Sequence, residues 1–140
     1  MIKVVLDTNV IVSSILTRGS PKAIFDLAVN RRIAWFVSEP IMAEYRRVLE
    51  YPRLKIKQAD IRKTLWAVKK HGHLVSPNFI VDRAGEEPDN RFLECAQEAK
   101  ANFLVTGNLK HFPSAWKYTK VVSPAVFLLH WQIQQPLGLE

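Results

Sequence analysis

Short apolar segments alternate with helical patterns along this 140-residue chain, and the alternation constrains the fold more than any other feature. The apolar segments are rich in β-branched residues and have the length of strands buried on both faces. We expect strands at residues 2–6, 33–37, 102–106 and 120–122, with a further short strand at 73–76. Apolar residues at helical spacing predict helices at about 20–31, 39–49, 58–71 and 88–99, and a terminal helix from residue 124.

Serine residues predict where three of these helices begin. Ser20 and Ser123 each precede a proline, and a serine N-cap followed by proline at the first helical position is a common helix start. Ser38 is expected to cap the second helix, and Pro88 to begin the fourth.

Alternation of strands and helices requires crossover connections between parallel strands. The expected architecture is therefore α/β: a three-layer α/β/α sandwich with helices on both faces of a central, mostly parallel sheet. Ligands bind such sheets in the crevice beyond the carboxyl ends of the strands. Asp7 follows the first strand and Thr106 ends a later one, so Asp7 and the segment from Thr106 to Asn108 should open onto one region.

Length and composition predict one globular domain spanning residues 1–140, with 48% hydrophobic and 24% charged residues. The apolar runs are far shorter than the roughly 18 residues that a membrane-spanning helix requires. Asp7 interrupts the apolar amino-terminal stretch, which argues against a signal peptide. Cys95 has no second cysteine to pair with, and these observations together favour the reducing cytoplasm.

The chain is basic, with 20 Lys and Arg residues against 13 Asp and Glu and a formal net charge of +7. This balance favours a polyanionic partner such as nucleic acid, although a solvated basic surface gives the same count. The predicted helix at 58–71 carries Arg62, Lys63, Lys69 and Lys70, which either line an RNA path or form a solvated face. The tryptophans outside the predicted strands are expected in the core or an interface: Trp66, Trp116 and Trp131.

Three acidic residues are candidates for a functional site. Asp7 should emerge where a buried strand meets the crevice, and partial desolvation there would raise its pKa. Glu44 lies at the margin of the apolar arc of its helix, and Asp89 lies in the first turn of a helix and points toward its packed side. Each also has a purely structural explanation: a turn aspartate, a boundary residue that reaches water, and a partner of the helix dipole.

Three carboxylates that share one edge of the sheet favour a metal site, because clustered carboxylates are usually neutralised by a cation. Oxygen ligands without a cysteine or histidine pair favour Mg²⁺ or Mn²⁺ over zinc. We interpret the four histidines as structural or surface residues: His71, His73, His111 and His130. Thr8, Asn9 and Thr106 are candidates for supporting roles, orienting metal-bound water through hydroxyl and amide groups.

Three sequence blocks resemble the PIN-domain family, in particular the bacterial and archaeal PIN proteins classed as toxin components of toxin–antitoxin systems. The blocks are VVLDTNVIVSSIL at 4–16, SEPIMAEYRRVLEYPRL at 38–54 and EPDNRFLECAQEAKANFLVTGNLKHF at 87–112. The resemblance implies a metal-dependent endoribonuclease that uses Mg²⁺ or Mn²⁺. It assigns catalysis and metal binding to Asp7, Glu44 and Asp89. It also implies a small antitoxin as a partner and assembly as a homodimer.

Two positions depart from the family pattern. Many members have an aspartate after the Thr-Gly pair, whereas Asn108 here keeps one oxygen ligand and lacks the charge. We therefore expect either a lower metal affinity or a second metal that binds only together with substrate. The acidic residue before Pro88 is doubled as Glu86 and Glu87, which leaves two alignments of Glu86 open.

Two other functions compete with the nuclease. Asn108 and the altered approach to Asp89 are compatible with a PIN-like domain that binds RNA or protein with little catalysis. A phosphoaspartyl domain is the third possibility because Asp7 ends the first strand, but phosphatases of the haloacid type need a second aspartate where this chain has Asn9.

Overall fold

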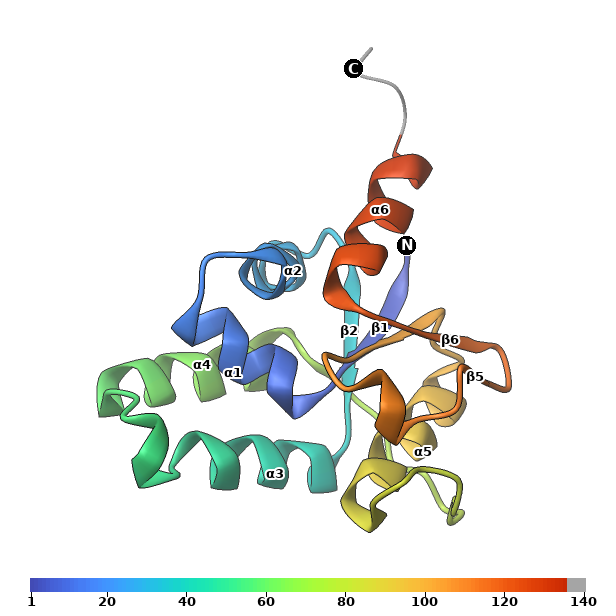
Figure 1. Ribbon diagram of the computed structural model, residues 1–140, viewed down its shortest axis with the longest axis horizontal. Coiled ribbons are helices and arrows are strands. Elements are labelled where there is room, and N and C mark those ends of the chain that lie inside the picture. Colours follow the sequence, from blue (N-terminus) through green and yellow to red (C-terminus); the bar gives the residue numbers. More distant parts are fainter. Residues whose placement is uncertain (136–140) are drawn as a thin grey trace.

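The computed structural model describes residues 1–135 and contains a six-stranded sheet flanked by helices (Figure 1). The strands are β1 (Lys3–Leu6), β2 (Ala34–Val37), β3 (His73–Leu74), β4 (Phe103–Val105), β5 (Ala115–Trp116) and β6 (Thr119–Val122). Their order is β3-β2-β1-β4-β6-β5, and every neighbouring pair is parallel except β5 with β6. The predicted α/β fold with a mostly parallel central sheet is confirmed.

Within residues 1–135, six α-helices and three 3₁₀ turns connect and cover these strands. The helices are α1 (Thr8–Leu16), α2 (Ser20–Val29), α3 (Glu39–Leu49), α4 (Gln58–His71), α5 (Asn90–Ala99) and α6 (Pro124–Gln134). The 3₁₀ turns are η1 (Pro52–Leu54), η2 (Glu87–Asp89) and η3 (Leu109–His111). Among residues 1–135, no helix combines the length and the apolar character needed to cross a membrane.

Helix α1 is the main element that the sequence patterns did not predict. It begins immediately after β1, and Asp7 is its N-cap, accepting a hydrogen bond from the Thr8 backbone N–H at 2.7 Å. Valine and isoleucine have low helix propensity. The burial of Val10 and Ile11 in the core offsets this cost, so tertiary packing determines the conformation of the segment.

The predicted helix starts are confirmed at two serines and shifted elsewhere. Ser38 and Ser123 accept hydrogen bonds from the backbone N–H groups of Ile41 at 3.4 Å and Val126 at 3.2 Å. Ser20 is not a cap, because Gly19 holds that position without a side-chain bond. Pro88 lies in the 3₁₀ turn η2, which directly precedes α5.

The core lies between the sheet and its helices. Leu6, Trp35, Phe92, Leu104 and Phe127 are fully buried. Helix α5 packs on β1, β2 and β4, whereas α1 packs on α2 and α3. This packing places α3 and the start of α5 close to the carboxyl end of β1, where Asp7 lies.

Candidate metal centre

The register of the two central strands brings Asp7 and Thr106 together. Strands β1 and β4 pair in parallel with Leu6 opposite Val105, and the Asp7 backbone N–H donates to the Val105 carbonyl at 2.9 Å. The Thr106 hydroxyl donates to Asp7 Oδ2 at 2.7 Å. Residues 99 positions apart in sequence therefore meet at the carboxyl end of the sheet, as the crevice argument predicts.

The Asp7 carboxylate is buried, since the residue is only 5% exposed. Its Oδ1 accepts from the Thr8 backbone, and its Oδ2 accepts from Thr106 and from the Asn9 amide at 3.1 Å. No Lys or Arg within the described residues forms an ion pair with it. Asp7 is therefore held by neutral donors alone.

Burial is the main cause that raises the pKa of Asp7 from 3.8 to about 6. The hydrogen bond from Thr106 opposes this rise, while the charges of Asp89 and Glu44 add to it. Thr8, the residue after Asp7, bonds to Glu44, so Glu44 lies at the same end of β1 as Asp7, and the charge of Asp89 also acts on Asp7. The assignment of the three carboxylates as metal ligands stays a prediction.

Glu44 lies on α3 and is tied to the residue that follows Asp7. The Thr8 hydroxyl donates to Glu44 Oε2, so Thr8 links two of the three carboxylates. Helix α3 is also anchored directly to β1, because the buried Tyr45 hydroxyl donates to the Leu6 carbonyl at 2.5 Å. Arg47 Nη2 lies 3.4 Å from Glu44 Oε1 in a partly exposed ion pair.

Asp89 ends η2 and is partly buried. Burial raises its pKa above 3.8, His111 opposes that rise, and Glu44 and Glu86 add to it. Its Oδ2 is buried and accepts no hydrogen bond. The His111 Nδ1 lies 3.3 Å away, which is an ion-pair distance without hydrogen-bond geometry. This oxygen thus has free lone pairs inside the site.

Glu86, Asp89 and His111 form a second, overlapping set of ligands. Each offers one atom, and these atoms all lie within 4.8 Å of one another, so the group could hold a metal ion. It is the sole set of three such residues in the described part of the chain, and it shares only Asp89 with the predicted trio. The Gly85 backbone N–H donates to the His111 carbonyl at 2.7 Å, which ties the two loops together.

His111 is the clearest residue that the sequence patterns missed. We interpreted it as structural or on the surface, because one histidine in a loop carries no spacing signal. The structure instead places it beside Asp89. Of the two adjacent glutamates, Glu86 and not Glu87 belongs to this group, while the alignment of Glu86 with the family pattern stays open.

The side chain of Asn108 is exposed, and its backbone N–H donates to the Thr106 hydroxyl at 2.9 Å. Beside it, the Gly107 backbone N–H donates to Asn9 Oδ1 at 3.0 Å. The two hydrogen bonds fix the segment after β4 to Asp7 through Thr106 and Asn9. Metal binding by Asn108 itself stays a prediction.

These residues fit a divalent cation. Carboxylate oxygens prevail, one buried Asp89 oxygen accepts no hydrogen bond, and burial, with a further contribution from neighbouring carboxylates, raises the pKa of both Asp7 and Asp89. A divalent cation would relieve all three features, because it supplies the missing partner and neutralises the cluster.

The predicted basic face of α4 is exposed: Arg62, Lys63, Lys69 and Lys70 all face solvent. Trp66 is 59% exposed, and the Lys70 ammonium lies 4.6 Å from its ring centroid. Trp66 is therefore not in the core, and its alternative place in an interface stays a prediction. Trp116 and Trp131 are partly buried against the core, as one of the two expected alternatives required.

Comparison with known proteins agrees with this geometry. A family model described as the PIN domain matches residues 3–110. The chain is also 32% identical over 111 residues to the uncharacterized protein MJ1680 of Methanocaldococcus jannaschii, covering 76% of this chain and 71% of that protein. The matched family segment contains Asp7, Glu44 and Asp89, and it ends one residue before His111.

Proposed function

Because this chain belongs to the PIN-domain family, we propose that it is a divalent-metal-dependent endoribonuclease that hydrolyses RNA phosphodiester bonds. In this proposal Asp7, Glu44 and Asp89 hold Mg²⁺ or Mn²⁺, with Asn108 as a further oxygen ligand. PIN domains are generally nucleases. The observation that carries the assignment is the buried Asp7 carboxylate, which has neutral donors, a pKa raised to about 6 and two acidic neighbours.

When bound, a divalent cation polarises phosphoryl oxygens, lowers the pKa of water and stabilises the leaving oxygen. The residues of this chain supply position and charge. Thr106 and Asn9 orient Asp7, and Thr8 orients Glu44, so the carboxylates are directed before a substrate arrives. The Tyr45 bond to Leu6 fixes the helix that carries Glu44.

We further propose that the protein acts in the cytoplasm as the toxin component of a toxin–antitoxin system, inhibited by a small antitoxin and assembled as a homodimer. The support for these roles is the resemblance in three sequence blocks. The basic net charge of +7 supports the choice of a nucleic acid as substrate.

One feature favours an alternative function, an RNA- or protein-binding domain with weak or no catalysis. The fourth ligand position is the uncharged and exposed Asn108, which weakens the site compared with a fourth carboxylate. Retention of RNA in chelator, with no cleavage in any divalent metal, would support this alternative.

The test compares the purified protein with Asp7→Asn on a mixed RNA substrate in Mg²⁺, Mn²⁺ and chelator. We expect metal-dependent cleavage by the wild-type chain and a loss of at least about 100-fold in the variant, because the substitution removes a charged ligand. Asp60→Asn, at an exposed position of α4, is the matched control and should keep full activity. Circular dichroism checks that all three proteins fold, and full cleavage by folded Asp7→Asn would overturn the mechanism.

A further inference from the structure

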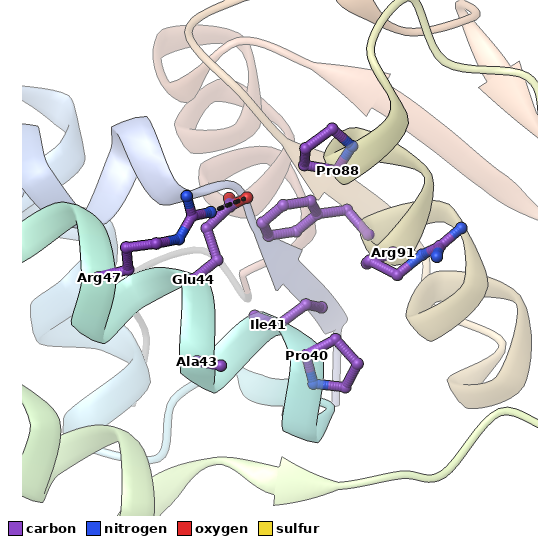
Figure 2. Close-up of a pocket in the computed structure, with 8 residues that line it drawn as sticks. Pro40, Ile41, Ala43, Glu44, Arg47, Pro88 and Arg91 are labelled. Carbon is purple, nitrogen blue, oxygen red and sulfur yellow. Dashed lines mark hydrogen bonds and ion pairs between the residues drawn. The ribbon is translucent and has the colours of Figure 1, made fainter.

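A pocket of about 300 Å³ lies beside Glu44, between α3 and the start of α5. Figure 2 shows its wall, with Pro40 and Glu44 on α3 and with Pro88 and Arg91 on the facing segment. Glu44 belongs both to the acidic cluster and to this wall. Whatever occupies the pocket therefore lies next to the proposed scissile phosphate.

The pocket is mainly apolar and small. Ile41 and Phe92 are buried, whereas Pro40, Ala43 and Pro88 are exposed residues of the wall. A volume of about 300 Å³ is at the lower end for ligand pockets and suits a single planar group. Phe92 is fully buried and offers no exposed ring face, so the faces of a nucleobase would pack against the exposed apolar residues Pro40, Ala43 and Pro88. The shape and chemistry thus fit one unpaired base.

The two arginines of the pocket differ in what they can bind. Arg91 Nη2 lies 2.8 Å from Glu94 and 3.0 Å from Glu87, so its charge is neutralised and its position fixed. Arg47 has a side chain that is 57% exposed and a single long contact of 3.4 Å to Glu44. An exposed pair of this kind is weak, and a guanidinium binds phosphate well.

We propose that this pocket is a nucleotide subsite that takes one unpaired base next to the cleaved bond, while Arg47 contacts the adjoining phosphate. The inference rests on the proposed ribonuclease function and adds the place on this chain where the base next to the cleaved bond is held. A base held in a duplex is stacked and paired, so it does not enter a side pocket of this size. The exposed positive charge of Arg47 complements the phosphate backbone of an unpaired strand.

The experiment has two parts: a variant of the protein that fills the pocket, and an RNA substrate that lacks the base. Ala43→Leu adds bulk at an exposed position of the pocket wall, and Ala23→Leu does the same at an exposed position of α2 as the matched control. The probe is a ten-nucleotide single-stranded RNA, intact or with one abasic ribose on either side of the mapped cleavage bond. The measurement is kcat/KM for each protein and substrate in Mn²⁺.

We expect wild-type kcat/KM to fall about tenfold when the base is missing on one side of the bond, and to change little on the other side. Ala43→Leu should lose about tenfold on intact RNA and cleave the abasic RNA as well as the wild type does. This non-additive pattern separates a lost base contact from a displaced Glu44, which would slow cleavage of both substrates. Ala23→Leu should match the wild type throughout.

Equal wild-type cleavage of intact and abasic RNA would overturn the subsite and leave the ribonuclease function standing. Equal losses by Ala43→Leu on both substrates would overturn it as well. If the wild-type chain cleaves no RNA in Mg²⁺ or Mn²⁺, both the function and the subsite fail. Arg47→Gln adds a second readout, since the loss of one phosphate contact should reduce the salt dependence of RNA binding by about one unit.

Discussion

Asp7 is an acidic side chain in an environment that disfavours its charged form. A carboxylate buried at the end of a central strand is unfavourable in its charged form, and Asp89 and Glu44 make it more so. The surrounding donors from Thr8, Thr106 and Asn9 reduce this cost without removing it, because the pKa remains raised. Residues that lower stability in this way are common at sites selected for binding or catalysis.

The raised pKa of Asp7 predicts how stability varies with pH in the metal-free protein. A folded-state pKa of about 6 against 3.8 in the unfolded chain means that the folded state binds the proton more tightly. The resulting stabilisation is complete below about pH 4 and is lost as pH rises through 6, a change of about 3 kcal/mol. Asp89, whose pKa is raised too, changes stability in the same direction.

Urea unfolding of the wild type and of Asp7→Asn in chelator, from pH 4 to pH 7, measures this effect. Between these pH values the wild type should lose more free energy of unfolding than the variant, by about 2 kcal/mol. Parallel pH profiles for the two proteins would show that the Asp7 carboxyl titrates normally and is not desolvated.

The site could be predicted from sequence at some residues and not at others. Asp7 could be placed because it directly follows an apolar strand, and strand ends meet at one sheet edge. Glu44 could be placed by helical projection, and the structure shows it contacting Thr8. His111 could not be placed, since its position depends on how two loops, joined by the bond from Gly85 to the His111 carbonyl, fold against each other.

At the scale of elements, α3 and β1 must be held together for Glu44 to approach Asp7. Tyr45 provides a direct link, with a buried hydroxyl that donates to the Leu6 carbonyl next to Asp7. Burial raises the pKa of this phenol well above 10, so it stays protonated and continues to donate. The link therefore joins the two elements across the full physiological pH range.

Tyr45→Phe removes this hydrogen bond without changing the shape of the ring. The Leu6 carbonyl then loses a donor in a buried environment, and we expect a loss of about 1–3 kcal/mol in the free energy of unfolding. Tyr118→Phe, at a position 81% exposed, is the control and should change stability by less than about 0.5 kcal/mol. Equal denaturant midpoints for wild type and Tyr45→Phe would contradict the proposed link.

Elements with strong periodicity were predictable, and those that depend on context were not. Helix α4 has the predicted bounds because its apolar residues, such as Ile61 and Val68, follow the helical period. Helix α1 was missed because its β-branched residues resemble a strand or turn. Strand β5 has only two residues and exists through antiparallel pairing with β6, which local sequence does not reveal.

At the scale of the whole molecule, the net charge of the chain and the charge of the acidic site have opposite signs. The net charge of +7 attracts a polyanion, whereas the site itself is acidic. A phosphate backbone is therefore attracted by distant basic residues and repelled at the centre. A divalent cation at the site would reduce this repulsion, because it would offset two of the negative charges and give the phosphate a positive ion to contact.

The exposed basic face of α4 yields a prediction about salt. Lys69→Gln combined with Lys70→Gln should weaken RNA binding and reduce the slope of log affinity against log salt by about one to two units, if these lysines contact phosphates. Fluorescence anisotropy at 50–200 mM salt, a range used for such titrations, measures this slope. Lys22→Gln, which removes a lysine already paired with Asp26, is the control. An unchanged slope would assign α4 to a solvated surface.

The central claim is that Asp7 and its acidic neighbours bind a divalent cation at the carboxyl end of the sheet. Anomalous diffraction from a crystal soaked in Mn²⁺ tests it most directly, because it locates the ion without a substrate. We expect a peak within about 2.5 Å of a carboxylate oxygen of Asp7 and of at least one of Glu44 and Asp89. A peak held only by Glu86 and His111, or no peak near Asp7 at saturating Mn²⁺, would contradict the claim.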